Sequence, residues 1–131
     1  MGKPTSRASP HALILFAHGA RDPEWRLPFD KIQRKIAARR PDLAVELAFL
    51  EIMQPSLPDA VARLSGAGHT HIIVAPMFMA QGGHLKRDLR QMLNGLREHH
   101  PAITLEALPA VGDIEPILNA ISDWLVNSTR H

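Results

Sequence analysis

Short apolar runs alternate along the chain with segments in which apolar residues recur at helical spacing. Four runs predict strands, over residues 12–17, 43–51, 71–78 and 103–108. The first run, ALILFA, contains no polar position, which is typical of a strand buried on both faces of a sheet. The third run is rich in β-branched residues, which favour strands.

The segments that follow the runs predict four helices, over residues 27–40, 57–64, 85–96 and 114–124. The last helix carries an apolar face made of Ile114, Ile117, Leu118, Ile121 and Trp124. Strands joined through helices run parallel, and their crossovers are right-handed. The pattern therefore predicts an α/β fold, a three-layer sandwich with a four-stranded parallel sheet in the order 2-1-3-4 and helices on both faces.

One domain accounts for most of the 131 residues, because 45% hydrophobic and 21% charged residues are typical of a globular protein with a single core. We expect a flexible arm over residues 1–11, one domain over 12–127 and a flexible tail over 128–131. The apolar run at 12–17 is too short for a signal peptide or a membrane span. We therefore expect a cytoplasmic protein without a membrane partner.

Composition excludes several kinds of chemistry. The chain has no cysteine, which removes disulfides, thiolate metal sites and cysteine nucleophiles. The formal net charge of +2, without a long basic run, argues against a nucleic-acid partner. The chain has eight histidines and no tyrosine, and imidazole is both a common metal ligand and a proton carrier near neutral pH.

The ends of the predicted strands carry the candidate functional residues. Ligands of open parallel sheets bind beyond the carboxyl ends of the strands. His18 follows the first strand, Glu51 ends the second, and Gly82, Gly83 and His84 follow the third. Because the first and third strands are neighbours in the expected order, His18 and His84 could share one site.

Several enzyme classes place a histidine and a glycine after a strand. Histidine phosphatases have an arginine before that histidine, whereas this chain has Ala17. The Gly-x-Ser-x-Gly elbow of hydrolases and the glycine spacing of Rossmann or Walker loops are both missing from the sequence. Two imidazoles and a carboxylate suit divalent cobalt, nickel, iron or zinc, and two histidines alone would hold a metal loosely. A purely structural role for these histidines is the alternative.

Four segments in this order resemble one protein family. They read LILFAHGARDP, VELAFLE, PSLPDAV and VAPMFMAQGGHLKRDL, and the similarity extends over residues 12–112. The sequence resembles the short, single-domain sirohydrochlorin cobaltochelatases of the CbiX type. The resemblance implies a chelatase-like fold and a lyase that inserts a divalent metal into sirohydrochlorin without a nucleotide, in cobalamin or sirohaem biosynthesis. The metal substrate would be cobalt, or else nickel or iron.

The resemblance also implies roles for the histidines. His18 and His84 correspond to the metal-binding and catalytic pair of the family, and the short form is expected to be a homodimer. Glu51 could assist as a proton acceptor or a metal ligand. Asp88, four residues after His84 on the same helical face, could orient its imidazole. One departure is Ala20, where the family often has a serine.

The substrate carries many carboxylates, so cations at the rim of the site would attract and orient it. The candidates for this role are Arg21, Lys86 and Arg87, and Gly82 with Gly83 would allow a bulky ligand to approach the backbone. A noncatalytic protein that binds or delivers a metal or a tetrapyrrole would use the same residues, and it is the alternative function.

Overall fold

The computed structural model describes residues 9–130. Within this range the strands are β1 (His11–Ala17), β2 (Ala44–Phe49), β3 (His71–Pro76) and β4 (Thr104–Ala107). The α-helices are α1 (Leu27–Arg39), α2 (Leu57–Gly66), α3 (Gly83–His99) and α4 (Glu115–Ser128). Two short 3-10 helices, η1 (Pro23–Arg26) and η2 (Val111–Asp113), precede α1 and α4. Residues 1–8 of the predicted arm and residue 131 of the predicted tail lie outside the described residues.

The strands form one parallel sheet in the order β2-β1-β3-β4, which confirms the predicted fold class and strand order. Side chains alternate between the two faces of a strand. In the central strand β1, Ile14 and Phe16 therefore enter the core on one face, and Leu15 enters the core on the other. The absence of polar positions in this run reflects burial on both sides.

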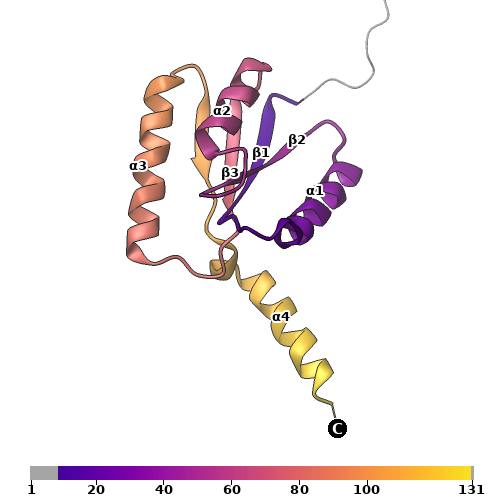
Figure 1. Ribbon diagram of the computed structural model, residues 1–131. Helices are drawn as coiled ribbons and strands as arrows, with labels where there is room; N and C mark the ends of the chain where they lie inside the picture. Colours follow the sequence, from indigo (N-terminus) through magenta and orange to yellow (C-terminus); the bar gives the residue numbers. More distant parts are fainter. Residues whose placement is uncertain (1–8, 131) are drawn as a thin grey trace, which may run out of the picture.

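Helices α2 and α3 cover the first face of the sheet, as Figure 1 shows. Leu57, Val61 and Leu64 of α2 are buried there. Helix α3 contributes a buried stripe of Leu89, Leu93 and Leu96, the i, i+4, i+7 spacing of one helical face. This face contains the larger part of the hydrophobic core.

Helix α1 covers the second face only over β1 and β2, where Phe29 and Ile32 pack against the cluster around Leu47 and Phe49. Helix α4 does not complete this layer. It leads away from the sheet (Figure 1) and contains no buried residue. The apolar face predicted for the last helix is present, but the described part of the chain does not bury it.

Among residues 9–130, no helix combines the length and the hydropathy that a membrane span requires.

Candidate functional site

Backbone hydrogen bonds tie together the loops that follow β1, β2 and β3. The amide of Leu50 donates to the carbonyl of Ala17 at 2.8 Å, and the amide of Met77 donates to the carbonyl of Phe16 at 2.7 Å. One step further, the amide of Glu51 donates to the carbonyl of His18 at 3.0 Å. The strand pairing thus continues past the strands and holds His18 in a defined position at the carboxyl edge of the sheet.

Gly19 makes this close pairing possible. Its φ is +94°, in the left-handed region, and a Cβ at this position would lie 1.9 Å from the carbonyl oxygen of Glu51. Only glycine tolerates both the dihedral angle and the approach. The glycine after His18 therefore has a structural reason, because it allows the loop after β2 to pack against the loop after β1.

The ring of His18 packs against Phe78, with the two ring centroids 4.7 Å apart. Phe78 belongs to the loop after β3 and is buried, whereas His18 is exposed. Within residues 9–130 the ring nitrogens of His18 make no hydrogen bond. Phe78 therefore supports one side of the His18 imidazole, and the ring nitrogens of His18 are free to bind a ligand or accept a proton.

Glu51 is exposed and lies in a tight turn. The next residue, Ile52, has a φ of +71°, and the amide of Met53 donates across it to the carbonyl of Glu51 at 2.7 Å. A β-branched residue is strained in this region, at a typical cost of about 1–3 kcal/mol. The main chain around Glu51 is therefore held by hydrogen bonds on both sides against a local strain.

His84 lies in the first turn of α3 and is exposed. A guanidinium nitrogen of Arg87, Nη2, donates to Nδ1 of His84 at 2.7 Å. Arginine has only donors, so Nδ1 is the acceptor and the neutral ring carries its hydrogen on Nε2. In this state Arg87 occupies the lone pair of Nδ1 and Nε2 carries the hydrogen, so neither ring nitrogen offers a lone pair to a metal until Arg87 leaves Nδ1.

The structure thus pairs His84 with Arg87, which was predicted to bind substrate. Asp88, predicted to orient the imidazole, makes no hydrogen bond to it within the described residues. Among residues 9–130, no group of three or more histidine and carboxylate side chains is arranged to hold a metal ion. His18, His84 and Glu51 are therefore not assembled as a three-residue metal site in this state.

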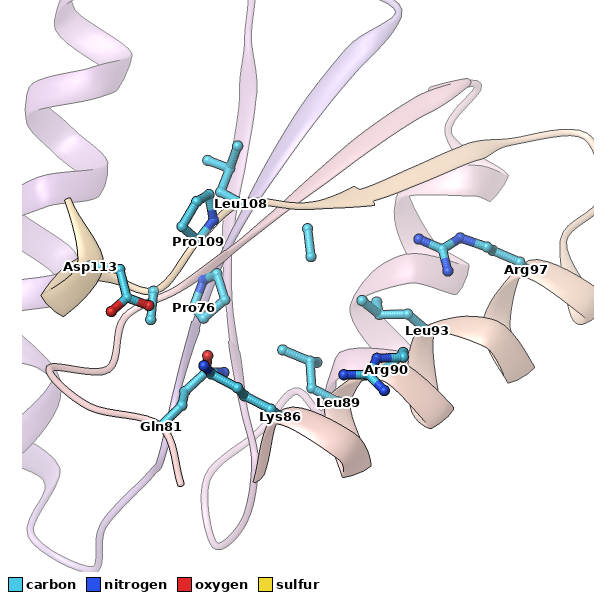
Figure 2. A pocket seen from close by; sticks show the side chains of 12 residues that line it. Pro76, Gln81, Lys86, Leu89, Arg90, Leu93, Arg97, Leu108, Pro109 and Asp113 are labelled. Carbon is cyan, nitrogen blue, oxygen red and sulfur yellow. The ribbon is translucent and has the colours of Figure 1, made fainter. Parts of the chain in front are cut away.

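A pocket of about 440 Å³ lies between α3 and the segment that follows β4. Figure 2 shows Lys86, Arg90 and Arg97 along α3, and Asp113 on the opposite wall. A more open depression of about 410 Å³ lies at the start of α3 and includes His84, with Arg90 common to both. A continuous basic surface therefore runs from His84 into the pocket.

The basic side chains of this surface differ in the contacts that they make with the rest of the chain. Arg97 donates to the carbonyl of Leu105 at 2.6 and 3.0 Å, so it caps the exposed edge of the sheet. Lys86, Arg87 and Arg90 take part in no ion pair within the described residues. Lys86 and Arg90 are therefore available to an anionic ligand, and Arg87 becomes available when it leaves Nδ1 of His84.

Sequence reasoning identified Lys86 and Arg87 but missed Arg90 and Arg97. The signal that could have identified them is their spacing with Lys86. This spacing places all three on one side of α3, next to its buried leucine stripe. The predicted Arg21 is exposed in the turn before η1 and lines neither pocket.

Comparison with known proteins relates most of the chain to one family. The CbiX family model matches residues 12–127. A sirohydrochlorin cobaltochelatase from Methanocaldococcus jannaschii is 34% identical over 68% of this chain and 62% of its own length. The one from Methanopyrus kandleri is 35% identical over 63% of this chain and 57% of its own length. The chain thus spans about three fifths of the length of these curated relatives.

Two solved structures are similar in fold. The CbiX protein from Marinobacter aquaeolei VT8 superposes with a TM-score of 0.79 at 30% identity, over 91% of this chain and 97% of that one. The sirohydrochlorin chelatase SirB from Bacillus subtilis subspecies spizizenii, in complex with cobalt, has a TM-score of 0.74 at 20% identity. The match covers 89% of this chain but 50% of SirB, so one copy of this fold corresponds to half of that protein.

Proposed function

The chain belongs to the CbiX family, and on this premise we propose that it is a lyase that inserts a divalent metal ion into sirohydrochlorin without a nucleotide. Cobalt is the metal substrate we propose first, because the curated relatives are named cobaltochelatases. Nickel and iron are the alternatives, since nitrogen and oxygen ligands accept all three. The reaction would serve cobalamin or sirohaem biosynthesis.

One structural observation carries the proposal. Two exposed imidazoles, His18 and His84, follow the neighbouring parallel strands β1 and β3, and the cations around His84 make no ion pair within the described residues. Metal insertion needs these groups, because the ion must be delivered and two pyrrole protons must be accepted. Imidazole can do both near neutral pH. A polycarboxylate substrate needs the cations.

Arg87 couples substrate binding to the release of His84. A substrate carboxylate offers its guanidinium a charge-assisted, bidentate pair, which is stronger than one bond to a neutral imidazole nitrogen. When Arg87 turns to the carboxylate, Nδ1 of His84 is free to carry the hydrogen, and Nε2 presents its lone pair. The imidazole can then ligate the metal substrate or accept a pyrrole proton.

Lys86 and Arg90 hold further carboxylates along the basic surface, with Arg21 at the outer rim. Gly82 and Gly83 leave room for the macrocycle, since a Cβ at either position would meet nothing within 4 Å. Packing in the chain therefore does not require glycine there, and ligand approach is the function that we propose for both. Glu51 serves as an additional proton acceptor or metal ligand.

The test is an absorbance assay of sirohydrochlorin with Co²⁺, Ni²⁺ or Fe²⁺, with and without the protein. We expect acceleration with the wild type and its loss in His18→Ala and His84→Ala. His99→Ala is the matched control, because His99 is also an exposed histidine of α3. An insertion rate equal to that without protein would refute the enzyme. Binding of sirohydrochlorin without acceleration would favour the delivery protein.

A homodimer belongs to the proposal. One copy corresponds to half of SirB, and the pockets of one copy are open, whereas a tetrapyrrole is a broad plate that needs walls on two sides. We propose that a second copy supplies the second wall. Light scattering at micromolar concentration should give a mass of twice 14.5 kDa.

A further inference from the structure

Two strongly exposed apolar residues lie on either side of the loop that carries His18. Ile52 and Met79 are 60% and 57% exposed, more than any other large apolar residue of the described chain outside α4. Ile52 belongs to the loop after β2, and Met79 belongs to the loop after β3. Because β1 lies between β2 and β3 in the sheet, the two residues approach His18 from opposite sides. Single exposed apolar residues are common on protein surfaces, so the argument for a role depends on their contacts.

Direct contacts place both residues close to His18. The amide of Glu51, directly before Ile52, donates to the carbonyl of His18 at 3.0 Å. On the other side, Phe78, directly before Met79, packs its ring on the His18 ring with the centroids 4.7 Å apart. Each exposed side chain is therefore one residue away from a group that touches His18. Neighbouring strands are about 4.8 Å apart, so the two loops leave the sheet about 10 Å from each other, with His18 between them.

The exposed position of Ile52 is held with backbone strain. Its φ is +71°, and the amide of Met53 donates across it to the carbonyl of Glu51, which is the rare and strained form of the γ-turn. Glycine and asparagine tolerate this dihedral angle, whereas a β-branched residue is an outlier there. The turn packs Met53 against the cluster around Phe49 and leaves Ile52 outside both hydrophobic clusters of the described residues. Ile52 thus adds strain without core packing, and strained residues concentrate at functional sites.

We propose that Ile52 and Met79 contact one face of the tetrapyrrole macrocycle and hold it over His18. This inference rests on the proposed function and names two substrate contacts that it does not contain. A metal ion bound to the imidazole of His18 lies about 2 Å from the ligating nitrogen, and it enters the macrocycle at the centre of the ring. The ring must therefore lie over His18 during the transfer. Because the ring extends sideways beyond its centre, it also covers the residues on both sides of His18.

The chemistry of the two surfaces matches. The macrocycle has apolar faces and carries its carboxylates at the rim. The two apolar side chains lie beside His18, where a face of the ring arrives, and the cations Lys86 and Arg90 lie on α3, which begins four residues after Met79. Isoleucine has a stiff side chain, and methionine is flexible and packs well against aromatic rings. The first gives the plate a fixed support, and the second adapts to it.

The first experiment titrates the full chain with metal-free sirohydrochlorin and follows its absorbance, so that the result does not depend on metal insertion. Ile52→Asn removes the apolar contact and tolerates the dihedral angle. We expect it to weaken binding by about five- to twentyfold, the effect of burying the exposed 60% of one isoleucine against a ligand. Met79→Gln, which keeps the length of the side chain, should also weaken binding. Ile52→Leu should retain most of the affinity, because it keeps the apolar volume. Equal affinities of wild type and Ile52→Asn overturn the inference.

Urea unfolding and light scattering separate this role from two structural ones. If Ile52 serves the ligand and not the fold, Ile52→Asn should unfold at a higher urea concentration than wild type, because asparagine relieves the strain of the turn. The mass measured by light scattering should be the same for both proteins. A lower unfolding midpoint would show that the isoleucine stabilises the folded chain. A lower mass would show that it covers an interface between copies. Either result overturns the inference.

The outcome is separate from that of the metal-insertion assay. A protein that binds sirohydrochlorin through Ile52 but does not accelerate metal insertion keeps this inference and removes the proposed activity. A wild type that accelerates insertion, with an Ile52→Asn variant of unchanged affinity, does the reverse.

Discussion

Replacement of Gly19 by alanine should destabilise the protein, and the structure sets the size of the effect. The φ of +94° places the new Cβ in a region that costs an L-residue about 1–2 kcal/mol. The same Cβ would lie 1.9 Å from the carbonyl oxygen of Glu51, which is main chain and cannot rotate away. Relief of this clash would break the bond from the Glu51 amide to the His18 carbonyl, at a net cost of about 0.5–1.5 kcal/mol. We expect a total loss of about 1.5–3.5 kcal/mol in the free energy of unfolding, the sum of these two costs.

The assay is urea unfolding followed by circular dichroism, with Gly95→Ala as the matched control. Gly95 lies inside α3, and a Cβ there would meet nothing within 4 Å. Because alanine favours helices, this control should stabilise the protein by about 0.5–1 kcal/mol. The same substitution should thus act in opposite directions at the two positions. A Gly19→Ala variant within 0.5 kcal/mol of wild type, a margin below the cost of the strained φ alone, would refute the reasoning. In that case the loops after β1 and β2 would not be tightly coupled.

Three further predictions concern the charged groups. Arg87→Ala should free Nδ1 of His84 and strengthen the binding of Co²⁺ in the absence of tetrapyrrole by about tenfold, which corresponds to the loss of one charge-assisted hydrogen bond. The same variant should lower kcat/KM with sirohydrochlorin. Calorimetry that shows an unchanged affinity for Co²⁺ would contradict this prediction. Arg90→Gln should raise the KM for sirohydrochlorin and weaken the dependence of this KM on salt concentration. Arg34→Gln, on the distant helix α1, should change neither the KM nor its salt dependence. The hydrogen bond from Arg40 lowers the pKa of Asp42. The stability that this pair contributes is present above the pKa of Asp in the unfolded chain, about 3.9, and is lost as the pH falls through the lower pKa of the folded state. The small difference in the free energy of unfolding between wild type and Asp42→Asn should therefore disappear in strong acid.

The sheet was predictable because its signal is local. A strand buried on both faces needs an unbroken apolar run, and the residues around Ile14 show one directly. The strand order followed from general rules of parallel sheets. The boundaries were less accurate, since the predicted strand 71–78 ends at Pro76. Proline lacks the amide that would continue the ladder toward β4, although the amide of Met77 still donates to Phe16 of β1. The apolar residues beyond Pro76 form a loop whose Phe78 supports His18.

The positions of the candidate site residues were also predictable, but their contacts were not. His18, Glu51 and His84 follow strands whose order could be inferred. The direction of a long, exposed side chain depends on neighbours that are distant in sequence. The sequence therefore did not indicate that Arg87 bonds to His84 or that Arg90 connects two pockets.

The amphipathic pattern of residues 114–124 was sufficient to predict a helix with an apolar face, because hydrophobic periodicity records that a face must be buried. It does not record against which surface, and the prediction placed this helix over its own sheet. Only the tertiary structure decided otherwise. The packing of Gly112 against Met79 sets the direction in which the chain leaves the sheet, and this close contact between distant residues is invisible in the periodicity of either segment.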